Sequence, residues 1–339
     1  MSNGRAHIKA ISYYLPPDLF TNADFLKEFP GQESNTHLEK TGVSERRIVG
    51  KGITSADLAI EAGKKLFSEH AVKPADIDFV LYCSLEFDYI FPATSVIVHK
   101  HLDLSTACGT LDLAVGCSGY PYALNFAKGL IETSGFKNVL VVNASTLTKM
   151  IHPRDKASRY LFGDAAAATL VSSRKEKQGI GEFIFGTESK KSEQIIIKDG
   201  AARNPISETS FVDFSDDNGN TTNNAHVYMN GFSVFNFGLK IVPEMITQLI
   251  EKNGAKPEDI DIFIFHQANL FMIDTIQKKM GISEEKVFNY IEKVGNTVSA
   301  SIPIALCEAQ RAGKIKPGSK VVLAAFGVGL SWGATIIDL

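Results

Sequence analysis

The sequence predicts an α/β protein in which one folding unit occurs twice. The main observation is a repeated segment: residues 73–83 read KPADIDFVLYC, and residues 256–266 read KPEDIDIFIFH, 183 positions later. In each copy a helix-like pattern precedes the segment, and a wholly apolar, strand-like run lies near its end. Continuous apolar runs are typical of strands whose sheet is covered by helices on both faces.

Two further matches support a duplication. A glycine-led strand that begins at Gly135 recurs from Gly318 with the same offset, and residues 118–124 recur at residues 300–306 with an offset one residue shorter. Three matches in one order indicate two related halves rather than an array of short repeats.

The individual elements follow from apolar spacing and turn residues. Residues 55–70 carry apolar side chains at helical intervals, and a Lys-Pro turn leads from them into a strand at residues 79–82. The other expected elements are strands at residues 139–142, 262–265 and 321–325 and a helix near residues 242–252. The polar, turn-forming stretch from residue 190 to residue 230 predicts a surface excursion inserted in the second half.

Length and composition limit the class of protein. A chain of 339 residues with 44% hydrophobic residues has enough apolar material for a large core, and we expect two halves, residues 1–174 and residues 175–339. A net charge of −3 gives no reason to expect nucleic-acid binding. Neither a secretory signal nor a membrane-spanning run is apparent, so we expect a cytoplasmic protein. The four cysteines show no close-set pairing, which argues against a metal site or a disulfide framework.

Cys117 is the first candidate for chemistry. It lies where an apolar run meets a small-residue turn and a helix pattern begins. The N-terminal end of a helix favours a thiolate, the nucleophilic form of cysteine. Gly116 and Gly119 on either side are expected to let a substrate approach. A buried structural cysteine is an equally good interpretation of this segment alone.

His266 and Asn296 are weaker candidates when each is taken alone. His266 ends an apolar strand, and the carboxyl ends of strands in such sheets are where ligands bind, but a single histidine there is more often structural. Asn296 precedes the helix that matches the Cys117 helix, and alone it indicates a turn and helix cap. The glycine-rich segment 326–333 lacks a phosphate-binding pattern, although its backbone N–H groups are suited to an oxyanion.

Together, these segments resemble the β-ketoacyl-acyl carrier protein synthase III family of the thiolase superfamily. The matching motifs are GCSGYPYAL, FHQAN, GNTVSASIPIAL and FGVGLSWGA, and the resemblance covers essentially the whole chain. It implies a thiolase-like fold, with duplicated α/β halves in five layers (αβαβα), and a homodimer that works without a cofactor on coenzyme A or acyl carrier protein thioesters. Phe91 corresponds to the residue that crosses the dimer interface to close the partner's acyl pocket.

The resemblance also implies a catalytic cycle. Cys117 takes an acyl group from a thioester, and its own N–H and one from the loop Gly327–Gly329 hold the oxyanion. The loop donor falls on Val328, where the family usually has glycine. His266 and Asn296 then bind a malonyl thioester, whose decarboxylation gives an enolate that attacks the acyl group. The product is a 3-oxoacyl thioester of fatty acid, polyketide or other specialised acyl biosynthesis.

The donor-binding residues depart from the family's pattern. Lys40 and Lys156 stand where the family has two arginines that contact coenzyme A, and Asn269 belongs to the motif that binds the thioester donor. The aromatic residue that stacks on the coenzyme A base is replaced by Thr36, and a basic residue is replaced by Phe271. The resemblance therefore leaves open whether the donor is bound to coenzyme A or to a carrier protein.

Two other functions compete with the condensing enzyme. One is an acyltransferase that passes the acyl group from Cys117 to a hydroxyl or amine without decarboxylation. The other is a non-catalytic partner subunit of a condensing heterodimer, against which the presence of all three polar residues argues. A cysteine hydrolase is disfavoured because no acidic residue is visibly placed to orient His266. Cys83, which faces His266 in the repeat, is expected to be scaffold.

Overall fold

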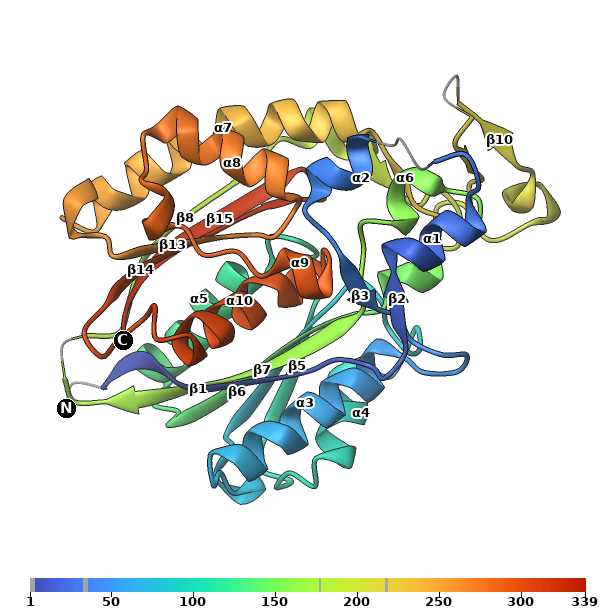
Figure 1. The fold of residues 1–339 in the computed structure, drawn as a ribbon. Helices are drawn as coiled ribbons and strands as arrows, with labels where there is room; N and C mark the ends of the chain where they lie inside the picture. Colours follow the sequence, from blue (N-terminus) through green and yellow to red (C-terminus); the bar gives the residue numbers. More distant parts are fainter. Residues whose placement is uncertain (1–3, 33–35, 177, 217–218) are drawn as a thin grey trace.

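A computed structural model describes residues 4–32, 36–176, 178–216 and 219–339. Two β-sheets face each other across two central helices, α5 (Gly119–Ser134) and α10 (Ser301–Arg311), as Figure 1 shows. Helices α3 (Ser55–Glu69) and α4 (Thr94–His101) cover the outer face of the first sheet. Helices α7 (Gly231–Lys252) and α8 (Leu270–Met280) cover the outer face of the second. The five layers are those of the predicted thiolase-like fold.

The two sheets have the same strand order. The first runs β1-β7-β6-β4-β5, and its strands are β1 (Arg5–Tyr14), β4 (Phe79–Cys83), β5 (Gly109–Leu113), β6 (Asn138–Ser145) and β7 (Ala165–Arg174). The second runs β8-β15-β14-β13, and its strands are β8 (Ile180–Thr187), β13 (Ile262–Phe265), β14 (Lys320–Gly327) and β15 (Ser331–Asp338). β4 pairs parallel with β6 in the first sheet, as β13 does with β14 in the second, and the strands that follow β6 and β14 in the order are antiparallel. The additional edge strand β5 of the first sheet pairs parallel with β4.

This correspondence is the predicted duplication. Strands β4, β6, β7 and β1 of the first half match β13, β14, β15 and β8 of the second. The Lys-Pro turns become 3-10 turns at Pro74–Asp76 and Pro257–Asp259, and helices α5 and α10 begin at equivalent positions. The chain passes from one sheet to the other between Arg174 and Ile180.

Shorter elements lie outside the two sheets. They are β2 (Leu19–Thr21), α1 (Asn22–Glu28), α2 (Thr36–Thr41), β3 (Glu45–Arg47), α6 (Lys156–Arg159) and α9 (Ile291–Val294). The predicted excursion contains β9 (Ile195–Ile196), β10 (Phe214–Ser215), β11 (Thr221–Thr222) and β12 (Tyr228–Met229), and its β10 end projects from the body of the molecule. Residues 217–218 of its polar stretch lie outside the described residues. The helix expected near residues 242–252 begins earlier, at Gly231, where the Asn230 side chain caps it.

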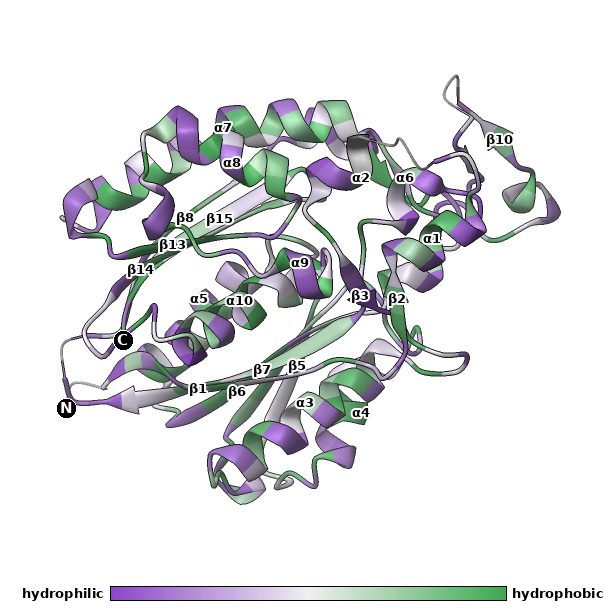
Figure 2. Ribbon diagram, in the orientation of Figure 1, coloured by the Kyte–Doolittle hydropathy of each residue, from purple (hydrophilic) through white to green (hydrophobic). Residues whose placement is uncertain are grey.

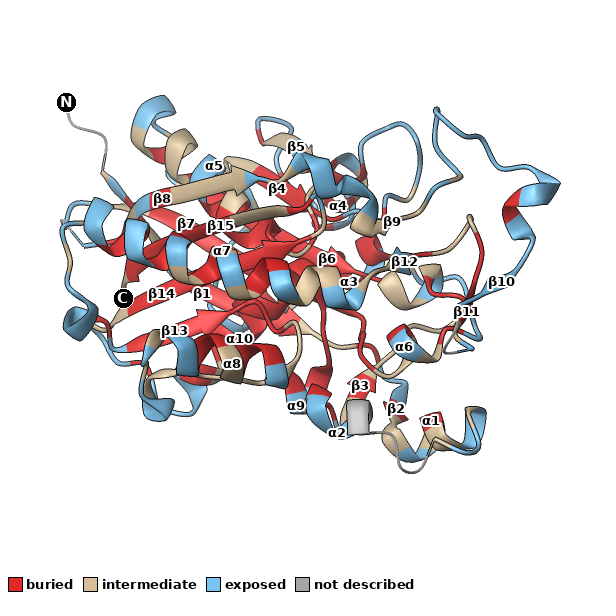
Figure 3. Ribbon diagram, turned by 90° about the horizontal axis from the view of Figure 1, so that it is seen from above, coloured by how far each residue is buried: buried red, intermediate tan, exposed pale blue. Residues whose placement is uncertain are grey.

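Apolar side chains gather on both faces of both sheets. The central core combines α5 and α10 with the inner faces of the sheets, including Leu81, Ile264 and Leu323. Separate cores lie under α3 and α4 and under α7 and α8. Apolar strands and amphipathic outer helices are visible in Figure 2, and Figure 3 shows that the strands are largely buried. No helix in the described ranges combines the length and the apolar character needed to cross a membrane.

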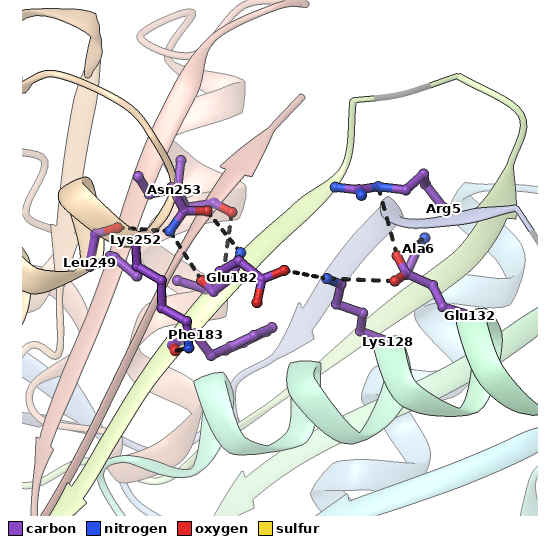
Figure 4. Close-up of polar contacts among 11 residues, drawn as sticks. Arg5, Ala6, Lys128, Glu132, Glu182, Phe183, Leu249, Lys252 and Asn253 are labelled. Carbon is purple, nitrogen blue, oxygen red and sulfur yellow. Dashed lines mark hydrogen bonds and ion pairs between the residues drawn. The ribbon is translucent and has the colours of Figure 1, made fainter.

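Polar contacts at one end of α5 connect the two halves. Lys128 of α5 lies 3.5 Å from Glu132 of the same helix and 3.6 Å from Glu182 of β8. Glu132 accepts a hydrogen bond from the backbone N–H of Ala6 in β1, and Asn253 after α7 accepts one from the backbone N–H of Glu182. Figure 4 shows this series of contacts from the first sheet to the second. Because the pairs are partly solvated, they orient the halves more than they stabilise them.

Two glycines of α5 provide a test of how tightly the central helices pack. A Cβ atom on Gly119 would lie 2.4 Å from Cys83 Sγ, whereas one on Gly129 would meet nothing within 4 Å. We expect Gly119→Ala to lower the free energy of unfolding by about 1–3 kcal/mol through overpacking. Gly129→Ala, the control in the same helix, should raise it by about 0.5–1 kcal/mol. Denaturant unfolding measures both changes, and Cys83→Ala should partly rescue Gly119→Ala. Equal effects of the two alanines would contradict this account of the packing.

Candidate active site

One cavity of about 500 Å³ brings together most of the predicted site residues. Cys117, His266 and Asn296 line it, and so do three of the residues expected around them, Asn269, Gly327 and Val328. Cys117 comes from the first half of the chain and the other five from the second. The arrangement places a thiol, an imidazole and a carboxamide on one enclosed space.

Cys117 lies directly before α5, where Ser118 is the N-cap. The helix was expected to favour the thiolate, but burial raises the pKa of the Cys117 thiol to about 11. Backbone N–H groups of Cys117 and Val328 at the sulfur lower the pKa and offset this only in part. The backbone donors thus act in the expected direction, but desolvation of the buried sulfur outweighs them.

The glycine-rich loop lies directly against the nucleophile. A Cβ atom on Gly327 would lie 2.4 Å from Cys117 Cβ, so no other residue fits there. Ser331 Oγ donates a hydrogen bond to the Val328 carbonyl (2.8 Å), which fixes the loop while the Val328 N–H faces the sulfur. Two N–H groups converge at the reacting sulfur, as an oxyanion hole requires.

The valine in this loop is accommodated by a glycine in the other half. A Cβ atom on Gly116 would lie 2.4 Å from Val328 Cγ1, and one on Gly119 would meet Cys83. We expected Gly116 and Gly119 to let a substrate approach. The atoms that lie against them are instead protein atoms, Val328 Cγ1 and Cys83 Sγ. The expectation is therefore corrected: Gly116 allows the Val328 side chain, and Gly119 allows the close packing of Cys83.

His266 follows β13 and is uncharged. Its ring is buried, with 2% of the residue exposed, and burial lowers its pKa to about 3. Nδ1 lies 2.7 Å from Ser301 Oγ at the start of α10, and Phe326 contacts the ring edge to face. When the serine hydroxyl donates to Nδ1, the proton lies on Nε2, and the ring is a neutral hydrogen-bond donor. No carboxylate accompanies it in the hydrogen bonds of the described residues.

Asn296 is held by both halves of the chain. Its backbone forms a β-bridge with Phe162, and its Oδ1 accepts the N–H of Val298 at 2.9 Å. Its Nδ2 donates to the Ala268 carbonyl at 3.4 Å, which leaves a second N–H for a ligand. Val298 has a φ of +51°, which is unfavourable for a β-branched residue and stores strain of about 1–3 kcal/mol beside the cavity.

Four of the predicted site residues lie outside the cavity lining. Lys40 is exposed, and its Nζ lies 5.5 Å from the centre of the Phe271 ring. Lys156 begins α6, Gly329 lies beyond the loop apex, and Phe91 is exposed on the surface. Their roles in donor binding, loop geometry and pocket closure remain predictions. For Thr36, the side chain lies outside the described residues.

Two residues near the site were missed by the sequence analysis. The first is Ser301, whose hydroxyl bonds His266. The sequence indicated it only by its position at the start of α10, the helix that corresponds to α5 in the repeat. Glu86 is a buried carboxyl that accepts hydrogen bonds from Ser84 Oγ (2.7 Å) and Ser145 Oγ (3.2 Å). Burial raises its pKa to about 7. An acidic residue directly after an apolar strand and beside the cavity residue Leu85 was its only signal. No group of three or more metal-ligating side chains occurs in the described ranges.

Comparison with known proteins identifies this chemistry. Residues 111–189 match the family model of 3-oxoacyl-[acyl-carrier-protein (ACP)] synthase III, and residues 250–339 match the model of its C-terminal part. The β-ketoacyl-[acyl-carrier-protein] synthase III of Caldanaerobacter subterraneus is 34% identical over 333 residues, 98% of this chain and 97% of that protein. The one of Clostridium perfringens is 35% identical and covers 96% of this chain and 97% of its own.

Solved structures give the same result. A crystal structure of a 3-oxoacyl-(acyl-carrier-protein) synthase III has a TM-score of 0.97 and 40% identity, covering 99% of this chain and 100% of its own. The priming β-ketosynthase of the R1128 polyketide pathway has a TM-score of 0.87 and 26% identity, covering 100% and 98%. The fold and site define an acyl-thioester condensing enzyme of the thiolase superfamily. More narrowly, the chain belongs to the 3-oxoacyl-[acyl-carrier-protein] synthase III family.

The buried Glu86 gives a prediction about pH and stability. Its pKa rises from 4.5 to about 7 on folding, so the native state binds more protons than the unfolded state between these values. The free energy of unfolding therefore falls as pH rises through this window. Glu86→Gln should remove this fall, and its stability relative to the parent protein should increase by up to about 3 kcal/mol between pH 4 and pH 8.

Denaturant unfolding at a series of pH values measures this difference. Glu258→Gln, on an exposed 3-10 turn, is the control and should follow the parent at every pH. Burial also raises the pKa of Asp164 to about 6. Because Asp164 is present in all three proteins, its contribution cancels when their stabilities are compared. Parallel curves for Glu86→Gln and the parent would show that Glu86 does not titrate in this range.

Proposed function

We propose that this enzyme transfers an acyl group from a thioester to Cys117 and condenses it with a malonyl thioester, with loss of carbon dioxide. The observation that carries the proposal is the shared cavity of Cys117, His266 and Asn296. A nucleophile and two neutral hydrogen-bond donors are the groups that this reaction needs. The product is a 3-oxoacyl thioester two carbons longer than the acyl group supplied.

The first step is acyl transfer. The bond between Cys117 Sγ and the acyl carbon forms as the bond to the carrier's sulfur breaks, and the thiol proton passes to the leaving sulfur. The backbone N–H groups of Cys117 and Val328 stabilise the oxyanion of the tetrahedral intermediate. Because both donors belong to fixed backbone, they need no reorganisation when the charge develops.

The second step is condensation. His266 Nε2 and Asn296 Nδ2 donate to the thioester carbonyl of the malonyl group. The bond to its carboxylate breaks, carbon dioxide leaves, and the electron pair becomes an enolate held by the two donors. The enolate carbon attacks the acyl group, the bond to Cys117 breaks, and the sulfur leaves as a thiolate that takes a proton from water to restore the thiol. A neutral His266 suits this role, because an imidazolium would bind the malonyl carboxylate and oppose its loss.

The substrates are proposed to be thioesters of acyl carrier protein, coenzyme A or both, with Lys40, Lys156 and Asn269 at the donor's path. No cofactor takes part in either step. We place the reaction in the cytoplasm, in fatty acid or specialised acyl biosynthesis. All four cysteines are free thiols, and the reaction requires Cys117 in its reduced form.

We propose a homodimer, based on an apolar surface beside the cavity. The segment from Leu85 to Phe91 exposes several large apolar side chains, among them Ile90 at 98% and Phe91 at 84% exposure. The residues that flank the segment hydrogen-bond to β5, the edge strand of the first sheet: the Ser84 N–H donates to the Leu113 carbonyl and the Thr94 N–H to Asp112. Contiguous apolar surface and a free sheet edge are typical of an interface. In this dimer Phe91 closes the partner's acyl cavity.

Intact-mass measurement tests the two chemical steps. The protein should gain the mass of one acyl group from an acyl thioester and should release carbon dioxide after malonyl-carrier protein or malonyl-coenzyme A is added. Cys117→Ala should abolish the adduct. Cys83→Ala, the control at a buried thiol, should leave it intact. The absence of an adduct with any donor, or its persistence in Cys117→Ala, would refute acyl transfer. Discharge onto an alcohol or amine without carbon dioxide would select the acyltransferase.

The hydrogen bond from Ser301 to His266 gives a second test. Ser301→Ala leaves Nδ1 without its partner and frees the ring tautomer, so the condensation rate should fall by about 10- to 100-fold. Acyl transfer to Cys117 should stay within about threefold, because His266 acts in the second step. Ser299→Ala is the control, since that buried hydroxyl bonds the Cys83 carbonyl. Equal losses in both steps would show that Ser301 only supports the fold.

Sedimentation tests the proposed dimer. Ile90→Asp would bury a carboxylate in an apolar interface and should shift the protein from dimer to monomer. Val212→Asp, at a position of the excursion that is 64% exposed, should leave the dimer unchanged. A parent protein that sediments as a monomer at micromolar concentration would contradict the dimer and the role of Phe91 together.

A further inference from the structure

The cavity beside Cys117 is much larger than a short acyl group requires. Its volume of about 500 Å³ lies in the range of pockets that enclose a whole small-molecule ligand. A two-carbon acyl group on Cys117 and a malonyl group at His266 and Asn296 would together fill only part of this space and leave the rest to water. Water against an apolar wall is unfavourable, so a wall of this kind favours a ligand that displaces it.

The side chains that line the cavity are mostly apolar. Aliphatic and aromatic residues from both halves contribute, including Leu147, Phe162, Val227 and Phe326. Besides Cys117, two ionisable side chains line the cavity: His266, which burial keeps uncharged at neutral pH, and Asp199. Asp199 belongs to the excursion, next to exposed residues. The lining suits a hydrocarbon chain rather than a polar or charged acyl group.

One wall of the cavity is built by the excursion. Strands β9 and β12 pair antiparallel, with Ile196 opposite Tyr228, and form a two-stranded ribbon. The Val227 N–H donates to the Met150 carbonyl (2.9 Å), which ties the ribbon to the body of the first half. Met150, Met229 and Met272 all line the cavity. Methionine is flexible, so this wall can adapt to chains of different length.

The cavity has a buried end and an exposed end. His266 and Asn296 at the inner end are buried, as is Phe326 beside them. Ala201 and Ile206 of the excursion also line the cavity, and both are exposed. An acyl chain attached to Cys117 therefore has an apolar path along the ribbon toward the surface.

We propose that the acyl group carried by Cys117 is a hydrocarbon chain of roughly six to twelve carbons, which lies along the β9–β12 ribbon with its methyl end near Ala201 and Ile206. The proposal rests on acyl transfer to Cys117, the first step of the proposed function. It names the substrate class of that step, and its failure can be separated from a failure of the step itself.

Acylation by a series of small thioesters tests the proposal without a carrier. N-acetylcysteamine thioesters from acetyl to dodecanoyl would be incubated with the protein, and the rate of adduct formation would be followed by intact mass. We expect kcat/KM for octanoyl to exceed that for acetyl by about 100-fold, since each methylene in an apolar pocket favours binding. An acetyl thioester that reacts as fast as octanoyl, or faster, would overturn the chain length. No adduct at any length would instead refute acyl transfer.

Neighbouring alanines provide a matched pair of variants. Ala201 lines the cavity and Ala202 does not, although both are exposed in the same loop. Ala201→Phe should lower the decanoyl-to-butanoyl ratio of kcat/KM by at least about tenfold, because the ring occupies the end of the path. Ala202→Phe should leave this ratio within twofold.

A second substitution obstructs the proposed path of the acyl chain at another lining residue. Ala225 lines the cavity next to Val227, and Ala225→Phe should shorten the longest chain accepted while butanoyl still reacts. Circular dichroism and thermal unfolding would confirm that each variant is folded. An unchanged preference in both Ala201→Phe and Ala225→Phe would overturn the path along the ribbon, even if long chains react.

Discussion

The contact between Gly327 and Cys117 is the constraint on which the site depends. A backbone from the second half lies so close to a side chain from the first that even one methyl group would not fit. This closeness brings the Val328 N–H to the sulfur, where it is the second donor of the proposed oxyanion hole. It is possible only because α5 and α10 pack between the two sheets and fix the halves relative to each other. The central core therefore determines the geometry of the reaction.

The same burial that creates this geometry keeps the resting site uncharged. Desolvation raises the pKa of the Cys117 thiol and lowers that of His266, so both groups are neutral near pH 7. A buried ion pair between them would carry a desolvation penalty, which the backbone N–H groups at the Cys117 sulfur offset only in part. Charge appears during the reaction instead, on an oxyanion and then on an enolate. At both places neutral N–H donors are already oriented, which is how a preorganised site lowers a barrier.

Much of the architecture could be predicted from the sequence, because it depends on local patterns. The apolar runs at β4 and β13, the repeated Lys-Pro turns and the helix starts of α5 and α10 all appear as expected. Selecting Cys117, His266 and Asn296 from similar residues required the resemblance, since each segment alone fitted a structural residue equally well. The local segment showed the N–H groups that favour a Cys117 thiolate but not the burial that opposes it, because that burial depends on residues more than 200 positions away, such as Gly327 and Val328. The Gly116–Val328 fit was missed for the same reason. The Ser301–His266 bond joins residues only 35 positions apart, but it depends on how α10 packs beside the end of β13, which no local pattern shows.

The differences between the two copies explain how one scaffold supports a single site. Cys83 occupies the place of His266 in the first half, where it packs against Gly119 and burial raises its pKa to about 12. Ser299 occupies the place of Cys117 in the second half and bonds a backbone carbonyl. The first half also adds the edge strand β5 beyond β4, and the second adds the excursion that forms a wall of the cavity. Each half has thus kept the shared core and changed at the positions where the copies meet substrate, partner or each other. Substitutions at the shared core should affect stability first, whereas substitutions at the divergent positions should affect chemistry, assembly or chain length.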